Sequence, residues 1–455
     1  MAASACSPSP RRRSWLSALY PAVWRWHFWA GLAVTPFLIV VSLTGALFVF
    51  QEELQVWTQP EVMTVTVPAD IPARSYTARF AAARAALPPQ WEFSSFNQHA
   101  EPGRADEIVF EREVTSHDDD AESPVDDDHA HEHEHQFVYV DPYTGEVLGQ
   151  QTLERSFFGI VLSLHRTLLA GSIGRYAVEL ATCWGIVSLL TGLLLWWPRG
   201  KEKLWGVWLP RLRRGGKLAL RDLHTIPGLY LFGAALAIMG TGLLYTQVWG
   251  QGAFAGLYFG GQLPPSYVSP PTSSPLPPDT APASIDDIVR EARTHYAFPT
   301  FHLAAPHGTD GCWTLFGATD TGDLDDGVVY LDASTGATLD VIDYPSLAPG
   351  AKTALLFYSI HTGSIFGLTT KIIAVLACLV IIAMSVTGVW MWWRRRPAGK
   401  FGAPRKTRTE QVPKTIAATI VGLAVLFPLV GLSIVVLWLG ETLLRVARRQ
   451  RAATA

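Results

Sequence analysis

Five stretches of the chain are apolar on every face, without the two-residue alternation of a half-buried strand. They cover residues 26–50, 176–197, 226–248, 372–393 and 415–439. A helix of about 20 apolar residues crosses the roughly 30 Å hydrocarbon layer of a bilayer, and each stretch reaches that length. The pattern predicts an α-helical polytopic membrane protein with four core transmembrane helices and a fifth, C-terminal span. Pro428 and Gly431 leave a hairpin open as the alternative for the fifth stretch.

Two long polar segments, residues 51–164 and 248–360, separate these apolar stretches. Each contains a helical stretch followed by two strand-like runs joined by an Asp-x-x-Thr-Gly turn, at residues 141–145 and 332–336. The pattern predicts two small α+β domains.

Composition supports a membrane protein. Hydrophobic residues make up 49% of the chain and charged residues 16%, whereas a soluble protein carries about 25% charged residues. The 17 tryptophans point the same way, because Trp concentrates at membrane interfaces. No phosphate-binding Gly-rich loop occurs in the sequence, and we expect no nucleic-acid partner.

The loops between the apolar stretches differ in charge. Residues 198–221 and 394–414 each hold eight Lys or Arg against one Glu. Residues 51–164 hold 22 acidic against six basic residues, and residues 248–360 hold 12 against three. Because basic loops stay in the cytoplasm, we expect a cytoplasmic N-terminus and two exported, periplasmic domains in a multi-pass membrane protein.

These boundaries divide the chain into six regions. They are residues 1–50 with the first transmembrane helix, 51–155 with the first exported domain and an insertion at 117–135, 156–250 with an approach helix and the second and third spans, 251–355 with the second exported domain, 356–396 with the fourth span, and 397–455 with a basic loop and the C-terminal span.

The chain is predicted to be a parallel tandem repeat. Several motifs recur with an offset of 196 or 197 residues. The matched sets are His27 with His224, Thr44-Gly45 with Thr241-Gly242, His165 with His361, Arg175 with Lys371, Thr191-Gly192 with Thr387-Gly388, and Trp196-Trp197 with Trp392-Trp393.

The Asp-x-x-Thr-Gly hairpins resemble PepSY domains, and the flanking His-x-x-x-Gly-Leu and Thr-Gly…Trp-Trp segments resemble the PepSY-associated transmembrane family. The resemblance covers roughly residues 20–395. Some members of that family are inner-membrane reductases of ferric siderophores that carry haem between their helices. The resemblance therefore implies a bacterial inner-membrane protein whose acceptor is a ferric siderophore or other iron chelate bound between the PepSY domains.

The four repeated histidines are the candidate haem ligands. His27 and His224 begin the first and third spans on the cytoplasmic side, whereas His165 and His361 precede the second and fourth spans on the exported side. Two imidazoles at one depth match the axial positions of a six-coordinate haem, so with the resemblance we predict two bis-His haem b groups. Taken singly, a histidine at the end of a span is more often an interfacial residue.

Matched glycines and cations are expected beside the haems. The glycines are Gly45, Gly242, Gly192 and Gly388. Glycine lets a helix backbone approach a flat ligand; tighter helix packing is the alternative. By the helix rise, the first two belong near the exported histidine pair and the last two near the cytoplasmic pair. Arg175 and Lys371 can pair with haem propionates, or else extend to lipid headgroups.

A histidine-rich and acidic tract occupies residues 117–135. Imidazole and carboxylate groups on a flexible chain collect divalent metal ions, so we expect weak binding of Fe, Zn or Cu. The alternative is a solvated loop without a function. The candidate ligands are His129, His131, His133 and His135.

The leading prediction is an oxidoreductase that transfers electrons across the inner membrane to an exported iron chelate. Its donor would be a separate cytoplasmic enzyme or a quinol, because the short cytoplasmic loops hold no nucleotide-binding fold. Two other classes stay open: a haem-free regulator or inhibitor of a peptidase, and an accessory metal-binding protein in metal uptake. No catalytic residue beyond the cofactor ligands is predicted.

Overall fold

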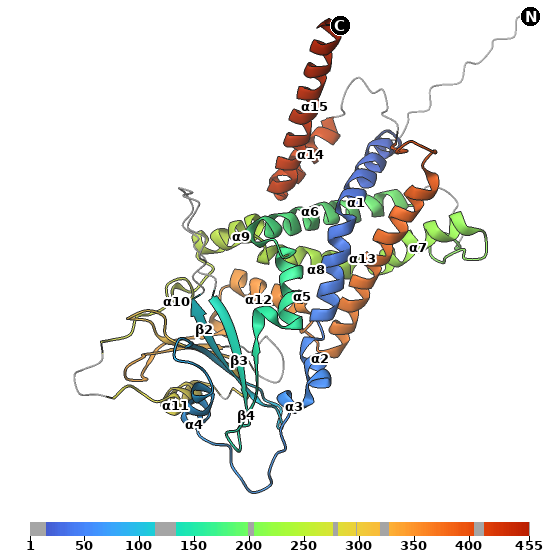
Figure 1. Cartoon of the computed structure of the whole chain (residues 1–455). Helices are drawn as coiled ribbons and strands as arrows, with labels where there is room; N and C mark the ends of the chain where they lie inside the picture. Colours follow the sequence, from blue (N-terminus) through green and yellow to red (C-terminus); the bar gives the residue numbers. More distant parts are fainter. Residues whose placement is uncertain are drawn as a thin grey trace, which may run out of the picture. The chain divides into compact units, whose positions relative to one another are not determined.

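The computed structural model describes residues 15–113, 133–198, 204–275, 281–296, 298–318, 327–404 and 414–454. The chain forms two compact units (Figure 1). Unit 1 comprises Met1–Leu43, Ala170–Gly250 and Leu376–Ala455, and unit 2 comprises Thr44–Leu169 and Gln251–Val375.

Four helices of the described residues contain a segment long and apolar enough to cross a membrane. They are α1 (Trp15–Phe48), α6 (Gly171–Trp196), α13 (Leu368–Arg395) and α15 (Pro428–Thr454). In a bilayer, the helix satisfies every backbone polar group internally, which is why apolar sequence of this length adopts it. The prediction of a multi-pass helical membrane protein is confirmed.

The third predicted span is broken. Its residues form α7 (Gly216–Tyr230) and α8 (Phe232–Gly242), followed by the 3-10 turn η2 (Leu243–Tyr245), and the two segments are bent by 67°. Pro227 lies inside α7 close to the break, and proline removes a helical hydrogen bond and bends the helix. Counted as one span, the bent pair raises the number of candidate spans to five.

The C-terminal apolar stretch turns back on itself. α14 (Lys414–Leu426) ends just before Pro428, the first residue of α15. A Cβ atom added to Gly431 would lie 2.8 Å from the Cβ atom of Ala424, whereas residues seven apart in one helix are separated by about 10 Å. The two helices therefore pack together as a hairpin, and α15 alone is long enough to span a bilayer.

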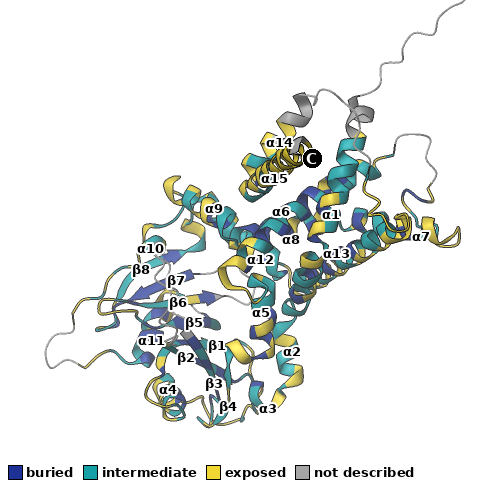
Figure 2. Ribbon diagram, turned by 45° about the horizontal axis from the view of Figure 1, so that its top comes forward, coloured by how far each residue is buried: buried dark blue, intermediate teal, exposed yellow. Residues whose placement is uncertain are grey.

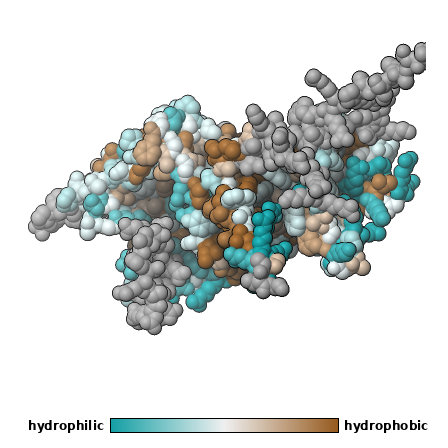
Figure 3. Space-filling view, turned by 90° about the horizontal axis from the view of Figure 1, so that it is seen from above, coloured by the Kyte–Doolittle hydropathy of each residue, from teal (hydrophilic) through white to brown (hydrophobic). Residues whose placement is uncertain are grey.

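Large apolar side chains on this hairpin are exposed. Val425, Leu437 and Leu443 expose 77%, 70% and 69% of their surface, and α14 and α15 are largely yellow in Figure 2. Elsewhere too, hydrophobic side chains lie uncovered beside hydrophilic ones (Figure 3). Soluble proteins seldom expose apolar surface to this extent, so the lipid bilayer is a partner of this chain.

The described strands of unit 2 form one antiparallel sheet in the order β4-β3-β2-β1-β5-β6-β7-β8. The first polar segment supplies β1 (Glu92–Gln98), β2 (Asp106–Glu113), β3 (His133–Val140) and β4 (Val147–Thr152). The second supplies β5 (Thr300–Ala304), β6 (Trp313–Ala318), β7 (Gly327–Leu331) and β8 (Thr338–Asp343).

Strands β1 and β5 join the two groups of four strands. Phe96 pairs with Leu303, and Asn97 pairs with His302. Without this contact each strand would be an open sheet edge, which invites pairing with another chain. The sequence predicted two small α+β domains; the structure gives both segments one shared sheet.

Two helices cover one face of the sheet, α4 (Tyr76–Ala85) and α11 (Ile285–His295) (Figures 1 and 2). Phe96, Phe110 and Phe301 are fully or almost fully buried beneath them. The helices are also tied by hydrogen bonds: the Asp286 carboxylate accepts from the backbone N–H of Tyr76 at 2.8 Å and of Thr77 at 2.9 Å. Asp286 thus caps α4 from α11.

Short helices flank the sheet in the chain. They are α2 (Gln51–Thr58), α3 (Pro60–Met63), η1 (Leu153–Arg155), α5 (Phe157–Thr167), α9 (Val248–Phe259), α10 (Pro265–Val268), η3 (Tyr344–Ser346) and α12 (Pro349–Thr362). α5 and α12 each bear one of the repeated histidines, His165 and His361.

An aspartate closes the turn between the last two strands of each segment. Asp141 accepts from the backbone N–H groups of Tyr143 and Thr144 between β3 and β4. Asp332, between β7 and β8, accepts from Ser334 and Thr335 and also from Ser274 at 2.7 Å. The glycine that ends each motif has a positive φ, +75° and +72°, which glycine adopts without strain.

Asp332→Ala is expected to lower the free energy of unfolding by about 2–3 kcal/mol, and Asp141→Ala by about 1 kcal/mol. Burial raises the pKa of Asp332, but backbone donors outweigh it and hold the pKa below its ordinary 3.8. The ionised Asp332 carboxylate therefore stabilises the folded state above about pH 4, and this stabilisation is lost as the pH falls through the folded-state pKa. Unfolding of the detergent-solubilised full chain measures the free energy of each variant. Equal losses in the two variants would contradict the larger role given to Asp332.

Candidate functional site

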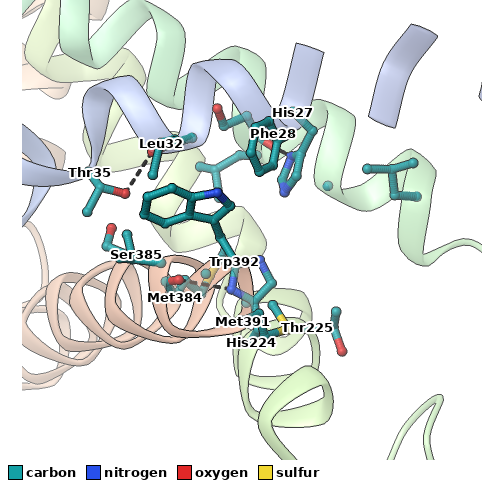
Figure 4. A pocket seen from close by; sticks show the side chains of 18 of the residues that line it. His27, Phe28, Leu32, Thr35, His224, Thr225, Met384, Ser385, Met391 and Trp392 are labelled. Atoms are coloured by element: carbon teal, nitrogen blue, oxygen red, sulfur yellow. Dashed lines mark hydrogen bonds between the residues drawn. The ribbon is translucent and has the colours of Figure 1, made fainter. Parts of the chain in front are cut away.

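His27 on α1 and His224 on α7 lie side by side in unit 1. Their ring centroids are 6.2 Å apart, with an angle of 82° between the ring planes. Figure 4 shows the two imidazoles at the wall of a cavity, close to Trp392 of α13. The structure thus brings together two histidines that are nearly 200 residues apart in the sequence.

A backbone carbonyl from another helix orients each imidazole. The Nδ1 atom of His27 lies 3.1 Å from the carbonyl oxygen of Ser188, and Nδ1 of His224 lies 2.9 Å from that of Met384. A carbonyl oxygen only accepts hydrogen bonds, so Nδ1 carries the proton and donates it. Nε2 then holds a free lone pair, which is the form of histidine that binds metal ions.

A threonine supports each of these hydrogen bonds. Thr191 Oγ1 lies 3.2 Å from Nδ1 of His27, and Thr387 Oγ1 lies 3.2 Å from Nδ1 of His224. These threonines are functional candidates that the sequence analysis missed, because it considered only the glycine of each Thr-Gly motif. The recurrence of the whole motif was the signal that contained them.

The four matched glycines occupy two kinds of position. A Cβ atom added to Gly192 would lie 3.2 Å from Cε1 of His27, and one added to Gly388 would lie 3.2 Å from Cε1 of His224. Gly45 lies in α1, and Gly242 is the last residue of α8. At the first two positions a Cβ atom would press against the imidazole, so glycine leaves the rings more room.

The cavity beside His27 and His224 has a volume of about 620 Å³, within the roughly 300–1,000 Å³ of small-molecule sites. Most of its wall is apolar or aromatic, and its described lining residues include no carboxylate. Its cationic lining residues are Lys217, Arg221, Arg394 and Arg395. Lys217 precedes His224 on α7 by about two turns, and Arg221 precedes it by about one turn. These cations therefore lie toward the beginning of α7, and Arg394 and Arg395 lie at the end of α13.

His165 on α5 and His361 on α12 form a second pair, in unit 2. Their ring centroids are also 6.2 Å apart, and their planes are tilted by 48°. The Oγ1 atom of Thr44 lies 3.3 Å from Nδ1 of His165. Thr44 immediately precedes Gly45, so the Thr-Gly motif of α1 contacts this second pair.

Both helices of the second pair end within two residues of their histidine, and a residue in a left-handed conformation follows. Gly363 has φ +76° two residues after His361, whereas Leu168 and Leu169 have φ +52° and +58° after His165. For a residue with a Cβ atom this conformation costs about 1–2 kcal/mol. Strain of this kind concentrates at functional sites.

The two matched cations differ in their surroundings. Lys371 Nζ lies 2.7 Å from Glu53 Oε1 in unit 2 and contacts the ring face of Phe50. Arg175 lies near the beginning of α6 in unit 1 and is half-buried. The ammonium group of Lys371 therefore already has a carboxylate partner from the chain itself.

A short loop, residues 204–211, is fastened to α6 and α7, and we call it the cap loop. Asp222 of α7, fully buried, accepts hydrogen bonds from Arg211 N, Nε and Nη2 at 2.8–2.9 Å. The Trp196 indole donates to the Val207 carbonyl, and the Tyr230 hydroxyl donates to the Trp208 carbonyl. Because Asp222 is two residues before His224, the cap loop restrains the helix that carries this histidine.

The histidine-rich tract is described only in part. His129 and His131 lie outside the described residues, whereas His133 and His135 belong to β3. Nδ1 of His135 lies 2.8 Å from Glu154 Oε1. Within the described ranges no group of three or more His, Cys, Asp or Glu side chains is arranged to hold a metal ion.

The centroid spacing of each histidine pair is compatible with two imidazoles that would hold one metal ion. A metal–imidazole bond is about 2.0 Å long and the nitrogen lies about 1.1 Å from the ring centre, so bound rings have centroids about 6 Å apart. Both pairs have 6.2 Å. Ordinary aromatic contacts have centroid distances of about 4.5–7 Å, so the spacing alone does not indicate a metal site. The hydrogen bonds that leave Nε2 of His27 and His224 free are the second observation that favours one.

Comparison with known proteins identifies the family. The family model described as PepSY-associated TM region matches residues 24–395. No curated protein matches the chain. The matched residues include α6, α7, α8, the whole sheet and all four repeated histidines. Because the match spans most of its length, the chain belongs to the PepSY-associated TM region family.

Proposed function

We propose that this protein holds two bis-His haems and transfers electrons through the inner membrane to an exported ferric siderophore or other iron chelate. One observation carries the proposal: two separate histidine pairs share the 6.2 Å spacing. In the first pair both Nδ1 protons are held by carbonyl oxygens, which leaves both Nε2 atoms as ligands. A haem-free regulator of a peptidase leaves this arrangement unexplained.

The proposal includes an orientation and a parallel repeat. The basic loops after α6 and α13 favour a cytoplasmic position for the ends of the helices near His27 and His224. The His165 and His361 pair then belongs to the exported side, with the sheet. The repeat is supported by matched contacts, since Gly192 and Gly388 stand in the same relation to their histidines.

Each group in the unit 1 cavity has a role in this proposal. Bound haem supplies a one-electron Fe(III)/Fe(II) couple. His27 and His224 would hold the iron, and Thr191 and Thr387 fix the ring orientation. The apolar wall excludes water, and the cations Arg221 and Arg394 offer partners for propionates.

The proposed reaction is a one-electron reduction. Ferric iron in an oxygen-donor chelate gains an electron and becomes ferrous iron, and no bond to carbon forms or breaks. Hard oxygen ligands hold ferrous iron less well, so the chelate releases it. The weak divalent-metal binding predicted for His129, His131, His133 and His135 would act on the released iron.

A proteoliposome experiment tests this function. Vesicles with the haem-loaded protein would contain dithionite inside and a ferric hydroxamate outside, together with an impermeant ferrous-iron indicator. We expect ferrous iron to form outside only with the haem-loaded chain. The function is wrong if the haem-loaded chain forms ferrous iron no faster than vesicles with the haem-free chain.

Gly388→Val is expected to displace the His224 ring, because even a Cβ atom would lie 3.2 Å from its Cε1 atom. The affinity for the unit 1 haem should fall about 10–100-fold, as when a partner that orients a ligand is lost. Haem titration of the apoprotein measures it. Gly240→Val on α8 is the matched control, since nothing lies within 4 Å of a Cβ atom there; similar losses in both variants would contradict the placement.

A further inference from the structure

One end of the unit 1 cavity is lined by cations, and further exposed cations lie next to them in the chain. Four come from the segment after the cap loop and from α7, and four from the end of α13 and the residues that follow. They are Arg213, Arg214, Lys217, Arg221, Arg394, Arg395, Arg396 and Lys400, and we call them the cationic surface. Lys217, Arg221, Arg394 and Arg395 also line the cavity.

The described residues beside this surface in the chain carry little negative charge. Among the described residues 204–230 and 391–404, Asp222 is the sole carboxylate, and it is fully buried and bonded to Arg211. None of the eight cations makes an ion pair within the described part of the chain. A haem has two propionates, so even with the cofactor bound the surface keeps a large excess of positive charge.

The cavity wall also limits the kind of electron donor. Oxidation of a quinol releases two protons, but the described lining holds no carboxylate to take them. As haem ligands, His27 and His224 would have no free nitrogen, because Nδ1 of each already donates to a carbonyl. A nicotinamide transfers two electrons as hydride, whereas a bis-His haem accepts one. This lining therefore favours a donor that delivers single electrons without protons.

We propose that the cationic surface docks an acidic one-electron donor protein with a flavin or iron–sulfur centre. This inference rests on the proposed function, since the electron enters at the His27 and His224 site. In the step, the reduced donor loses one electron, ferric haem iron gains it, and no bond or proton moves. Opposite charge raises the rate of encounter about 10–1,000-fold at low salt, and salt removes this gain.

The structure offers a pair of matched variants. Arg213→Glu/Arg214→Glu reverses two adjacent exposed arginines of the cationic surface that do not line the cavity. Arg448→Glu/Arg449→Glu reverses two adjacent exposed arginines on α15, outside that surface. Both variants change the net charge equally, so only the position of the charges differs.

The experiment uses the full chain in nanodiscs of zwitterionic lipid, with reduced flavodoxin as the acidic probe. At low salt, Arg213→Glu/Arg214→Glu is expected to lower the second-order rate of haem reduction about tenfold. The haem of the control variant should be reduced at the wild-type rate. About 0.5 M salt should abolish the difference in rate between the Arg213→Glu/Arg214→Glu variant and the wild type. Reduction by photoreduced deazaflavin, which is uncharged, should be equal in all three proteins.

Two outcomes would overturn the inference. One is a flavodoxin rate that is insensitive to salt and to both variants; the other is an equal loss in the control. Anionic lipid headgroups are the competing occupant. Lipid is favoured if phosphatidylglycerol nanodiscs stabilise the wild-type protein but not the Arg213→Glu/Arg214→Glu variant, while flavodoxin reduces both proteins at the same rate.

Failure of docking and failure of the proposed function give different results. Binding of oxidised flavodoxin to the chain, followed by biolayer interferometry, requires no haem. A chain that binds no haem but binds flavodoxin in a salt-sensitive manner would contradict the haem function and leave the docking surface in place. A haem-loaded chain that deazaflavin reduces and flavodoxin does not bind would contradict only the docking.

Discussion

His224→Ala is expected to reduce bound haem from two per chain to one and to slow reduction of an external ferric chelate at least about 100-fold. His224 would be one of the two histidines that hold the iron at the unit 1 site, and alanine cannot replace its imidazole. His165 and His361 lie in unit 2 and keep their 6.2 Å spacing, so the second haem should remain. Haem per chain and the rate of ferrous-iron formation in proteoliposomes measure both effects.

His295→Ala provides the control for this prediction. His295 is the last residue of α11, in unit 2, and its Nε2 atom lies 2.9 Å from Thr338 Oγ1. We expect two haems per chain and an unchanged rate in this variant. If His224→Ala also retained two haems, the pairing of His27 with His224 would be wrong.

Asp222→Ala is expected to lower the free energy of unfolding by about 3–5 kcal/mol, the loss typical when one partner of a buried ion pair is removed. The Asp222 side chain is fully buried, and Arg211 donates three hydrogen bonds to it. Alanine would remove all three of these hydrogen bonds and release the cap loop from α7. Because Asp222 is two residues before His224, we also expect weaker haem binding in unit 1.

An exposed ion pair sets the scale for this second prediction. Arg445 and Glu441 pair on the surface of α15 with about 60% of each side chain exposed. Such pairs contribute at most about 1 kcal/mol, so Arg445→Ala should change the unfolding midpoint little. Denaturant unfolding of both variants in the same detergent compares them, and a small loss for Asp222→Ala would show that the cap loop is not fastened by this pair.

The sequence predicted the membrane helices well, because length and apolar composition alone determine them. It did not predict the break between α7 and α8, since Pro227 in an apolar run marks a bend without fixing where the chain turns. For the fifth stretch it offered a span or a hairpin. The close approach of Gly431 to Ala424 shows that the chain turns back there, while α15 alone remains long enough to span a bilayer. Only tertiary structure shows such contacts.

The shared sheet was beyond the reach of sequence patterns. The strands and their turns follow from alternation and from the Asp-x-x-Thr-Gly motifs, but β1 carries no mark that pairs it with β5. Such pairing brings together residues about 200 positions apart, such as Asn97 and His302. The beginning of β3 was also hidden, because His133 and His135 resembled the end of a polar insertion.

The candidate site was predicted in outline. The repeat indicated which histidines belong together, and the structure brings His27 next to His224 and His165 next to His361. The carbonyl oxygens that accept the Nδ1 hydrogen bonds belong to the backbones of α6 and α13, and no residue type reveals them. Lys371 shows the opposite case: a cation expected near a propionate has Glu53 as its partner.

The haem content and visible spectrum of the purified full-length protein test the central claim most directly. The account predicts two haems per chain in the oxidised protein and, on reduction by dithionite, the sharp α-band of low-spin bis-His haem. A protein that is colourless and takes up no haem when it is reconstituted would contradict the assignment of both histidine pairs and with it the proposed electron transfer.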